Sequence, residues 1–196
     1  IVGNGEPFVS EVDESDGSIS LYQPRIAVVT NISLDHKSMD ELRALFGDFI
    51  AKADAAILNL DNEETMRLAH RAKEAVTYSI DTEGGDFGAI TIEPQPFGIS
   101  FMAIDRRGGE QIHVDLKTPG RHNVSNALAA IGAAVAAGVP FVNATRALSS
   151  FEGVKRRFEY VGAANGVTVI DDFGHNPDKI AATLKTLHDF PGRLLI

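Results

Sequence analysis

The segment GRHNVSNALAA, residues 120–130, gathers polar side chains at the start of a predicted helix. His122, Asn123 and Asn126 bring hydrogen-bond donors and acceptors to this helix N-terminus, where free backbone N–H groups and the helix dipole favour an anionic or polar ligand. An asparagine amide carries both donors and an acceptor, which suits the edge of an adenine ring. The alternative is that Asn123 merely caps the helix.

Two further polar clusters follow predicted strands near the start of the chain. The run EVDESD, residues 11–16, contains four carboxylates that repel one another without a cation or another partner. The run NISLDH, residues 31–36, ends just before a predicted amphipathic helix. Because ligands bind at the carboxyl ends of strands in open α/β sheets, Glu11 and His36 could share a hard cation there. The alternatives are a solvated acidic turn and a structural histidine.

The last quarter of the chain contains two more clusters. In FEGVKRRFE, residues 151–159, phenylalanines flank a Lys-Arg-Arg run, and arginine forks suit phosphate or ribose contacts. The alternative is a basic surface run. In DDFGHNP, residues 171–177, two aspartates end a predicted strand and a proline opens a helix. The aspartates and His175 exceed what a helix cap requires, although Asn176 could simply be that cap.

An alternation of strands and helices must position these clusters. Continuous apolar runs and period-2 patterns predict strands at residues 8–12, 25–30, 54–60, 75–80, 158–163, 167–171 and 193–196. Period-3.6 patterns predict helices at residues 38–53, 62–72, 123–137, 143–150 and 177–187. Short strands between Pro and Gly turns predict an antiparallel meander at residues 88–93, 97–104 and 111–116. The predicted fold class is α/β, a mainly parallel sheet with helices plus a small antiparallel meander.

Composition narrows the functional classes. The chain has 196 residues, of which 44% are hydrophobic and 23% charged, as in an ordinary globular protein. The absence of cysteine excludes disulfides and thiolate chemistry. The net charge of −9 argues against non-specific nucleic-acid binding. We expect no membrane span and no secretory leader. Both ends run into predicted strands, so we expect a piece of a longer protein.

Taken in order, the clusters resemble the Mur ligase family, the ATP-dependent amide ligases of peptidoglycan synthesis. The order is an acidic strand end, N-x-x-x-D-H, G-x-H-N-x-x-N-x-x-A-A, x-x-R-R-F-E and D-D-x-x-H-N-P. The pieces DESDGS, RRFE and DDFGHNP are most similar to the branch that joins L-alanine to UDP-N-acetylmuramate. The resemblance implies that residues 1–150 are a partial central ATP-binding domain and residues 151–196 the beginning of a Rossmann-like C-terminal domain.

The resemblance also implies ligands and residue roles. The cofactors would be ATP and Mg²⁺, the partners UDP-N-acetylmuramate and an amino acid or peptide acceptor, with no nucleic acid or membrane partner, and the location cytoplasmic. Catalytic roles fall on Glu11, His36 and His175, of which Glu11 and His36 would also hold the metal. Nucleotide-binding roles fall on His122, Asn123, Asn126, Arg157 and, for the ribose, Asp172, while Asn176 would bind substrate.

Departures from the family pattern leave alternatives open. The family's phosphate loop, a glycine-rich run ending in Gly-Lys-Thr/Ser, is absent from these residues, so we expect this piece alone not to hydrolyse ATP. Phe46 stands where several branches carry a carbamylated lysine, as expected for the alanine-adding branch. The short KSMDEL segment after D-H leaves the substrate open. The alternatives are a tripeptide-adding ligase, a cyanophycin or folylpolyglutamate synthetase relative, and a non-catalytic nucleotide-binding module.

Overall fold

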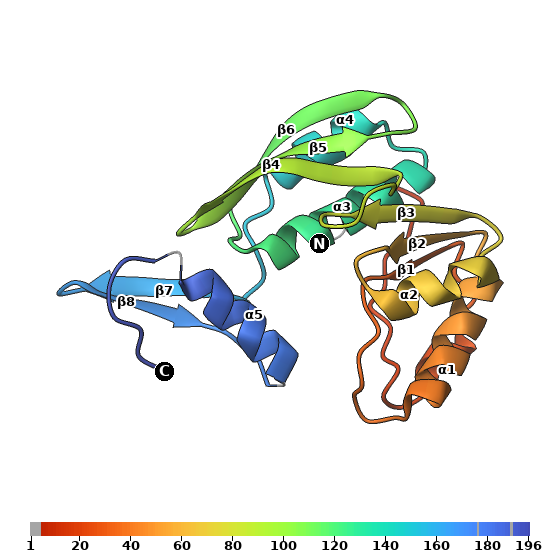
Figure 1. Cartoon of the computed structure of the whole chain (residues 1–196), viewed down its shortest axis with the longest axis horizontal. Coiled ribbons are helices and arrows are strands. Elements are labelled where there is room, and N and C mark those ends of the chain that lie inside the picture. Colours follow the sequence, from red (N-terminus) through yellow and green to blue (C-terminus); the bar gives the residue numbers. More distant parts are fainter. Residues whose placement is uncertain (1–4, 176, 189) are drawn as a thin grey trace.

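A six-stranded sheet forms the larger part of the computed structural model, which describes residues 5–175, 177–188 and 190–196. The strands lie in the order β1-β2-β3-β4-β5-β6 (Figure 1). Neighbouring strands from β1 to β4 are parallel, and β4, β5 and β6 are antiparallel, which confirms the predicted parallel sheet with its meander. Their bounds are β1 (Ile26–Val29), β2 (Ala55–Asn59), β3 (Ala75–Ser79), β4 (Phe87–Gln95), β5 (Gly98–Asp105) and β6 (Glu110–Leu116).

Helices cover both faces of this sheet. The α-helices of this part are α1 (Met39–Lys52), α2 (Glu63–Leu68), α3 (Arg121–Ala136) and α4 (Phe141–Leu148), and the short 3-10 turns are η1 (Ser18–Leu21) and η2 (Ala69–Arg71). A capping box fixes the start of α1, because the Ser38 hydroxyl accepts from the Glu41 N–H while the Glu41 carboxylate accepts from the Ser38 N–H. None of the helices in the described residues is long and apolar enough to cross a membrane.

Strand β2 separates two hydrophobic clusters. Its five residues are all buried. Ile57 belongs to the cluster under α3 and α4, whereas Ala56 and Leu58 belong to the cluster under α1. Side chains alternate between the two faces of a strand, and a strand covered on both faces is therefore apolar throughout. This explains the continuous apolar run from which the strand was predicted.

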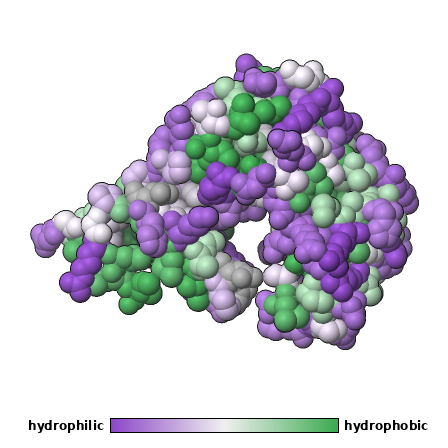
Figure 2. Space-filling model, viewed as in Figure 1, coloured by the Kyte–Doolittle hydropathy of each residue, from purple (hydrophilic) through white to green (hydrophobic). Residues whose placement is uncertain are grey.

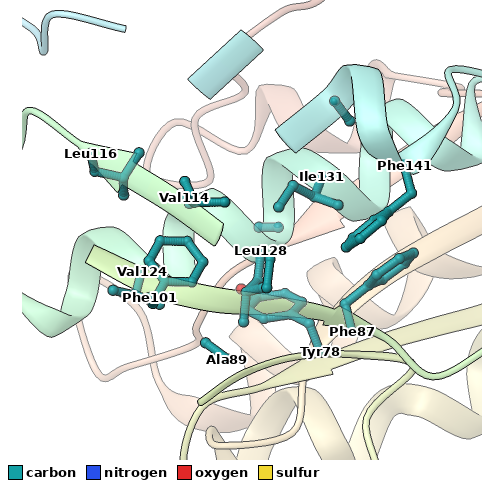
Figure 3. Close-up of a cluster of buried hydrophobic side chains, with 14 of the residues drawn as sticks. Tyr78, Phe87, Ala89, Phe101, Val114, Leu116, Val124, Leu128, Ile131 and Phe141 are labelled. Carbon is teal, nitrogen blue, oxygen red and sulfur yellow. The ribbon is translucent and has the colours of Figure 1, made fainter. Parts of the chain in front are cut away.

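The larger cluster holds α3 and α4 against β3 to β6 (Figure 3). Tyr78, Phe87 and Phe101 contribute buried rings from three neighbouring strands, and Phe87 stacks on Phe141 of α4 with ring centroids 6.0 Å apart. On α3, Gly132 lets the helix approach the sheet, because a Cβ there would lie only 3.0 Å from Cγ2 of Ile57. The second half of α3 is thereby held close to β2.

A smaller unit follows, with a two-stranded antiparallel sheet and one helix (Figure 1). It consists of β7 (Glu159–Ala164), β8 (Val167–Asp171) and α5 (Pro177–Leu187). Hydrophobic side chains gather on the surface over β7 and β8 (Figure 2). Phe97, in the turn between β4 and β5, packs edge-on against Tyr160 and Phe190 and so connects the two units.

Two predicted strands are wrong. Residues 8–12 and 193–196 form no strand, and Phe8 and Val9 are each 92% exposed. Both segments have apolar, strand-like composition, but neither pairs with a strand of the described residues, and an extended segment becomes a strand only through a neighbour's hydrogen bonds. Helix α3 begins at Arg121, two residues before the expected start. The division at residue 150 remains a prediction.

Replacing Tyr78 with phenylalanine tests the larger cluster. The buried Tyr78 hydroxyl makes no hydrogen bond of normal geometry within the described residues. Burial raises the pKa of its phenol to about 12, although the nearby Ser125 side chain opposes this shift. At pH 7, Tyr78→Phe should therefore leave the free energy of unfolding unchanged or raise it. An unfolded tyrosine ionises near pH 10 while the folded one stays protonated, so the wild type should lose about 1.4 kcal/mol relative to the variant by pH 11.

Urea unfolding at pH 7 and pH 11 measures this difference. Tyr160→Phe is the matched control, because Tyr160 is 52% exposed and lies outside the buried cluster. Parallel pH dependence of the wild type and Tyr78→Phe would contradict the prediction.

Candidate functional site

The start of α3 is built on a glycine. Gly120 is the residue before the helix, with φ of 98° and no side chain to cap the free N–H groups. Asn123 donates its amide to the Pro119 carbonyl at 2.7 Å and so braces the turn from inside the first helical turn. Asn123 therefore does not cap α3, because Gly120 holds the N-cap position, and its nucleotide-binding role stays a prediction. Asn126 and His122 are exposed on this first part of the helix.

Helix α5 of the smaller unit approaches this same turn. A Cβ on Gly120 would lie 2.5 Å from the Thr186 hydroxyl and 2.7 Å from the His122 ring. Thr186 is 3% exposed. Crowding by neighbouring atoms desolvates the His122 ring and lowers its pKa, while the charge of Asp172 opposes this shift. His122 thus favours a neutral imidazole, with one donor and one acceptor nitrogen.

The acidic run and His36 lie near each other, although not as predicted. Glu11 is exposed and lies on irregular backbone, not at the end of a strand. Hydrogen bonds from Ser15 lower the pKa of Asp13, and the charge of His36 lowers it further. His36 has a positive φ of 52°, and its Nε2 lies 3.3 Å from Asp35. The structure therefore brings the acidic run to His36 through Asp13.

No group of three or more His, Asp or Glu side chains suited to a metal ion occurs in the described residues. A preformed cage is not required for Mg²⁺, which usually keeps several waters and takes one or two carboxylates plus substrate phosphates. An exposed acidic run beside a histidine fits that pattern of few protein ligands.

In the smaller unit, Asp172 ties three segments together. Its carboxylate accepts from the Phe158 N–H at 2.9 Å, the Gly174 N–H at 2.8 Å and the Thr183 hydroxyl at 3.0 Å. It therefore fixes the Arg-Arg-Phe segment to the loop after β8 and to α5. One carboxylate has about four acceptor positions, so three bonds leave room for a ligand hydroxyl.

Two of the remaining predicted residues, Arg157 and His175, lie beside Phe173. The guanidinium carbons of Arg156 and Arg157 lie 4.7 and 5.6 Å from the centre of its ring. His175 packs against the same ring and its Nδ1 lies 3.1 Å from the Phe173 carbonyl oxygen. Asn176 lies outside the described residues. Phe173, which the sequence prediction did not single out, thus holds both arginines in place.

A cavity of about 330 Å³ lies between the segment before α3 and the segment before β7. Lys117, Pro119 and Phe97 line it from the larger unit, and Arg157 and Tyr160 line it from the smaller one. Of the predicted site residues that the structure describes, Arg157 alone lines it. The structure brings His122 close to Asp172, whereas His122, Asn123 and Asn126 do not face this cavity.

Sequence reasoning missed the turn after β2. Residues 59–62 read Asn-Leu-Asp-Asn, at the junction of a predicted strand and a predicted helix. Three of the four side chains bind segments from elsewhere in the chain. The available signal was the density of hydrogen-bonding side chains directly after a buried strand, at the edge where open α/β sheets bind ligands.

Two family models match this chain. The Mur ligase middle domain matches residues 3–134, and the Mur ligase, glutamate ligase domain matches residues 156–196. A curated UDP-N-acetylmuramate–L-alanine ligase from Geobacter sp. is 40% identical over 191 residues, which are 93% of this chain and 41% of that protein. The chain thus spans about two fifths of the length of this relative.

Solved structures agree in fold. MurF from Acinetobacter baumannii superposes with a TM-score of 0.80 at 26% identity, covering 91% of this chain and 40% of that one. UDP-N-acetylmuramate-alanine ligase MurC from Thermotoga maritima gives a TM-score of 0.76 at 28% identity, covering 90% and 41%. The shared fold includes the mainly parallel sheet described above.

Replacing Gly120 with alanine tests the contact between α5 and α3. Alanine would have to keep the φ of 98° that L-residues rarely adopt, and its Cβ would meet Thr186 and His122 at distances that force them to move. Gly138→Ala is the matched control, because Gly138 has φ of 93° at the other end of α3 with nothing within 4 Å of an added Cβ. Backbone strain should lower the free energy of unfolding of both variants by about 1 kcal/mol. The contacts of the new Cβ should lower that of Gly120→Ala by at least about 1 kcal/mol more.

Denaturant unfolding of the two variants measures this difference. Equal losses in the two variants would mean that Thr186 does not press on Gly120.

Proposed function

Because the chain belongs to the Mur ligase family, we propose that it is part of an ATP-dependent ligase that joins L-alanine to UDP-N-acetylmuramate. The observation that carries this proposal is the 40% identity to the UDP-N-acetylmuramate–L-alanine ligase from Geobacter sp., which extends over 93% of this chain. The five motifs from the acidic run to DDFGHNP support it. The reaction would belong to the cytoplasm, where the soluble nucleotide substrates are made.

The proposed reaction has two steps. A carboxylate oxygen of UDP-N-acetylmuramate attacks the γ-phosphorus of ATP, and ADP leaves. The amine of L-alanine then attacks the acyl carbon, and phosphate leaves as the amide bond forms. Such phosphoryl transfer depends mainly on positioning and on neutralising charge. When bound, Mg²⁺ would neutralise charge on the phosphates.

The residues fall into two groups in this proposal. Glu11 and His36, with Asp13 beside them, would face the metal and the transferring phosphate. His122, Asn123, Asn126, Arg157 and Asp172 would hold the nucleotide, supported by the free N–H groups and dipole at the start of α3. His175, on the smaller unit, would act beside the reacting groups.

The acceptor is tested with the full-length protein that contains this chain. With UDP-N-acetylmuramate, ATP and Mg²⁺, L-alanine should stimulate phosphate release and yield the amide product, whereas the tripeptide should not. Stimulation by the tripeptide would instead indicate the neighbouring branch of the family. Phosphate release with neither acceptor would count against a cell-wall ligase.

The metal roles are tested in the same full-length protein. Glu11→Gln and His36→Ala should each lower Mg²⁺-dependent turnover at least about tenfold, which corresponds to roughly 1.4 kcal/mol. His113→Ala is the matched control, because His113 is also an exposed histidine beside an aspartate, Asp115, at 3.0 Å. Turnover unchanged in Glu11→Gln and His36→Ala would refute these roles.

A further inference from the structure

Three side chains in the turn after β2 bind the two segments that follow the neighbouring strands β1 and β3. We call Asn59, Asp61 and Asn62 the strand-end hub. The hub follows the most completely buried strand of the sheet, so its backbone is held firmly on one side. Its side chains point to the segments that follow β1 and β3. These are the loops that a ligand at this edge would meet.

The two asparagines bind the segment that leads to His36. Asn59 donates its amide to the Thr30 carbonyl at 3.0 Å. Asn62 accepts from the Ile32 N–H at 3.3 Å and donates to the Ile32 carbonyl at 3.4 Å. Asn62 also accepts from the Thr65 N–H at 3.0 Å and thereby caps α2. The segment after β1 is therefore held at two points shortly before His36.

The aspartate binds the segment after β3. The Asp61 carboxylate accepts from the N–H groups of Ile80 at 2.6 Å and Thr82 at 2.7 Å, and from that of Asp81 at 3.2 Å. Three successive backbone amides on one carboxylate fix the course of this loop. Hydrogen bonds to a charged group are roughly twice as strong as neutral ones.

The loop after β3 in turn holds the beginning of α3. Asp81 accepts from Nη2 of Arg121 at 2.6 Å. Arg121 is the first residue of α3 and immediately precedes His122. A chain of contacts thus runs from Asp61 through Asp81 to Arg121, and the same turn holds the segment before His36.

We propose that the strand-end hub positions His36 and the start of α3 relative to each other, so that Asn59, Asp61 and Asn62 are positioning residues of the ligase. This inference rests on the proposed function. The metal side and the nucleotide side of the site lie on segments far apart in the sequence, and the hub connects them through side-chain contacts. Because a displacement of about 1 Å can cost about 10²-fold in rate, such a connection governs catalysis without touching substrate.

Kinetics of the full-length protein test the hub. Asp61→Asn should raise KM for ATP, with at least a tenfold loss in kcat/KM, because its carboxylate holds the loop after β3. Asn62→Ala should instead lower kcat, because its side chain holds the segment before His36. Asp81→Asn and Arg121→Met should raise KM for ATP at least threefold with little change in kcat, because they affect the nucleotide side alone. Their double variant should be no worse than either single one. Both side chains are well exposed, 67% for Asp81 and 40% for Arg121, so these variants should fold.

Asp105→Asn is the matched control. Asp105 also accepts from two backbone N–H groups, those of Arg107 and Gly108. These residues form the turn between β5 and β6, which lies at the opposite end of the meander from the turn between β4 and β5. Its replacement should leave KM and kcat unchanged. Equal kinetic losses in Asp61→Asn and Asp105→Asn would indicate a general loss of stability and overturn the proposal, as would additive losses in Asp81→Asn and Arg121→Met.

Hydrogen exchange separates this inference from the proposed function. In Asp61→Asn, amides of residues 80–82 and 121–123 should exchange at least tenfold faster than in the wild type, and in Asn62→Ala those of residues 31–36 should do so, while those of β5 and β6 should not change in either variant. This readout requires no activity. If the wild type showed no ligase activity, the proposed function would fail, and faster exchange confined to these segments would still support the hub. Unchanged exchange there would overturn it.

Discussion

The arrangement of the site depends on the burial of β2 on both faces. Ile57 packs under α3 while Leu58 packs under α1, so this strand is held between two hydrophobic clusters. Its neighbours β1 and β3 pair with it in parallel, and all three strands therefore end at one edge. Loops that would otherwise be independent are brought together there. The polar turn after β2 begins from the most constrained position in the sheet.

Hydrophobic periodicity was sufficient to predict most elements. The apolar run of β2 and the period-3.6 pattern of α1 are local signals, and both correspond to observed elements. The strand predicted at residues 8–12 failed because pairing is not a local property. The same reason explains the missed hub, since Asn59 binds Thr30 and Asp61 binds Thr82, and no spacing rule connects residues so far apart.

For the site, the residue types could be predicted, but their mutual contacts could not. Asn123 could be chosen from the sequence as a polar residue at a helix start, yet its bond to the Pro119 carbonyl depends on the unusual φ of Gly120. Likewise, Asp172 could be chosen as an acidic residue at a strand end. That it accepts from Phe158, Gly174 and Thr183 follows from the folding of the smaller unit around it.

The two units meet at Gly120, whose lack of a side chain lets α5 come close to the start of α3. Thr186 of α5 occupies the space that a Cβ of Gly120 would need, and Asp172 lies near enough to influence His122. Arg121, in the same turn, is held from the other side by Asp81. The start of α3 thus receives one contact from the strand-end edge and one from α5. A shift of either unit would move His122. The geometry of this turn therefore couples the position of the smaller unit to the loops at the carboxyl ends of β1, β2 and β3.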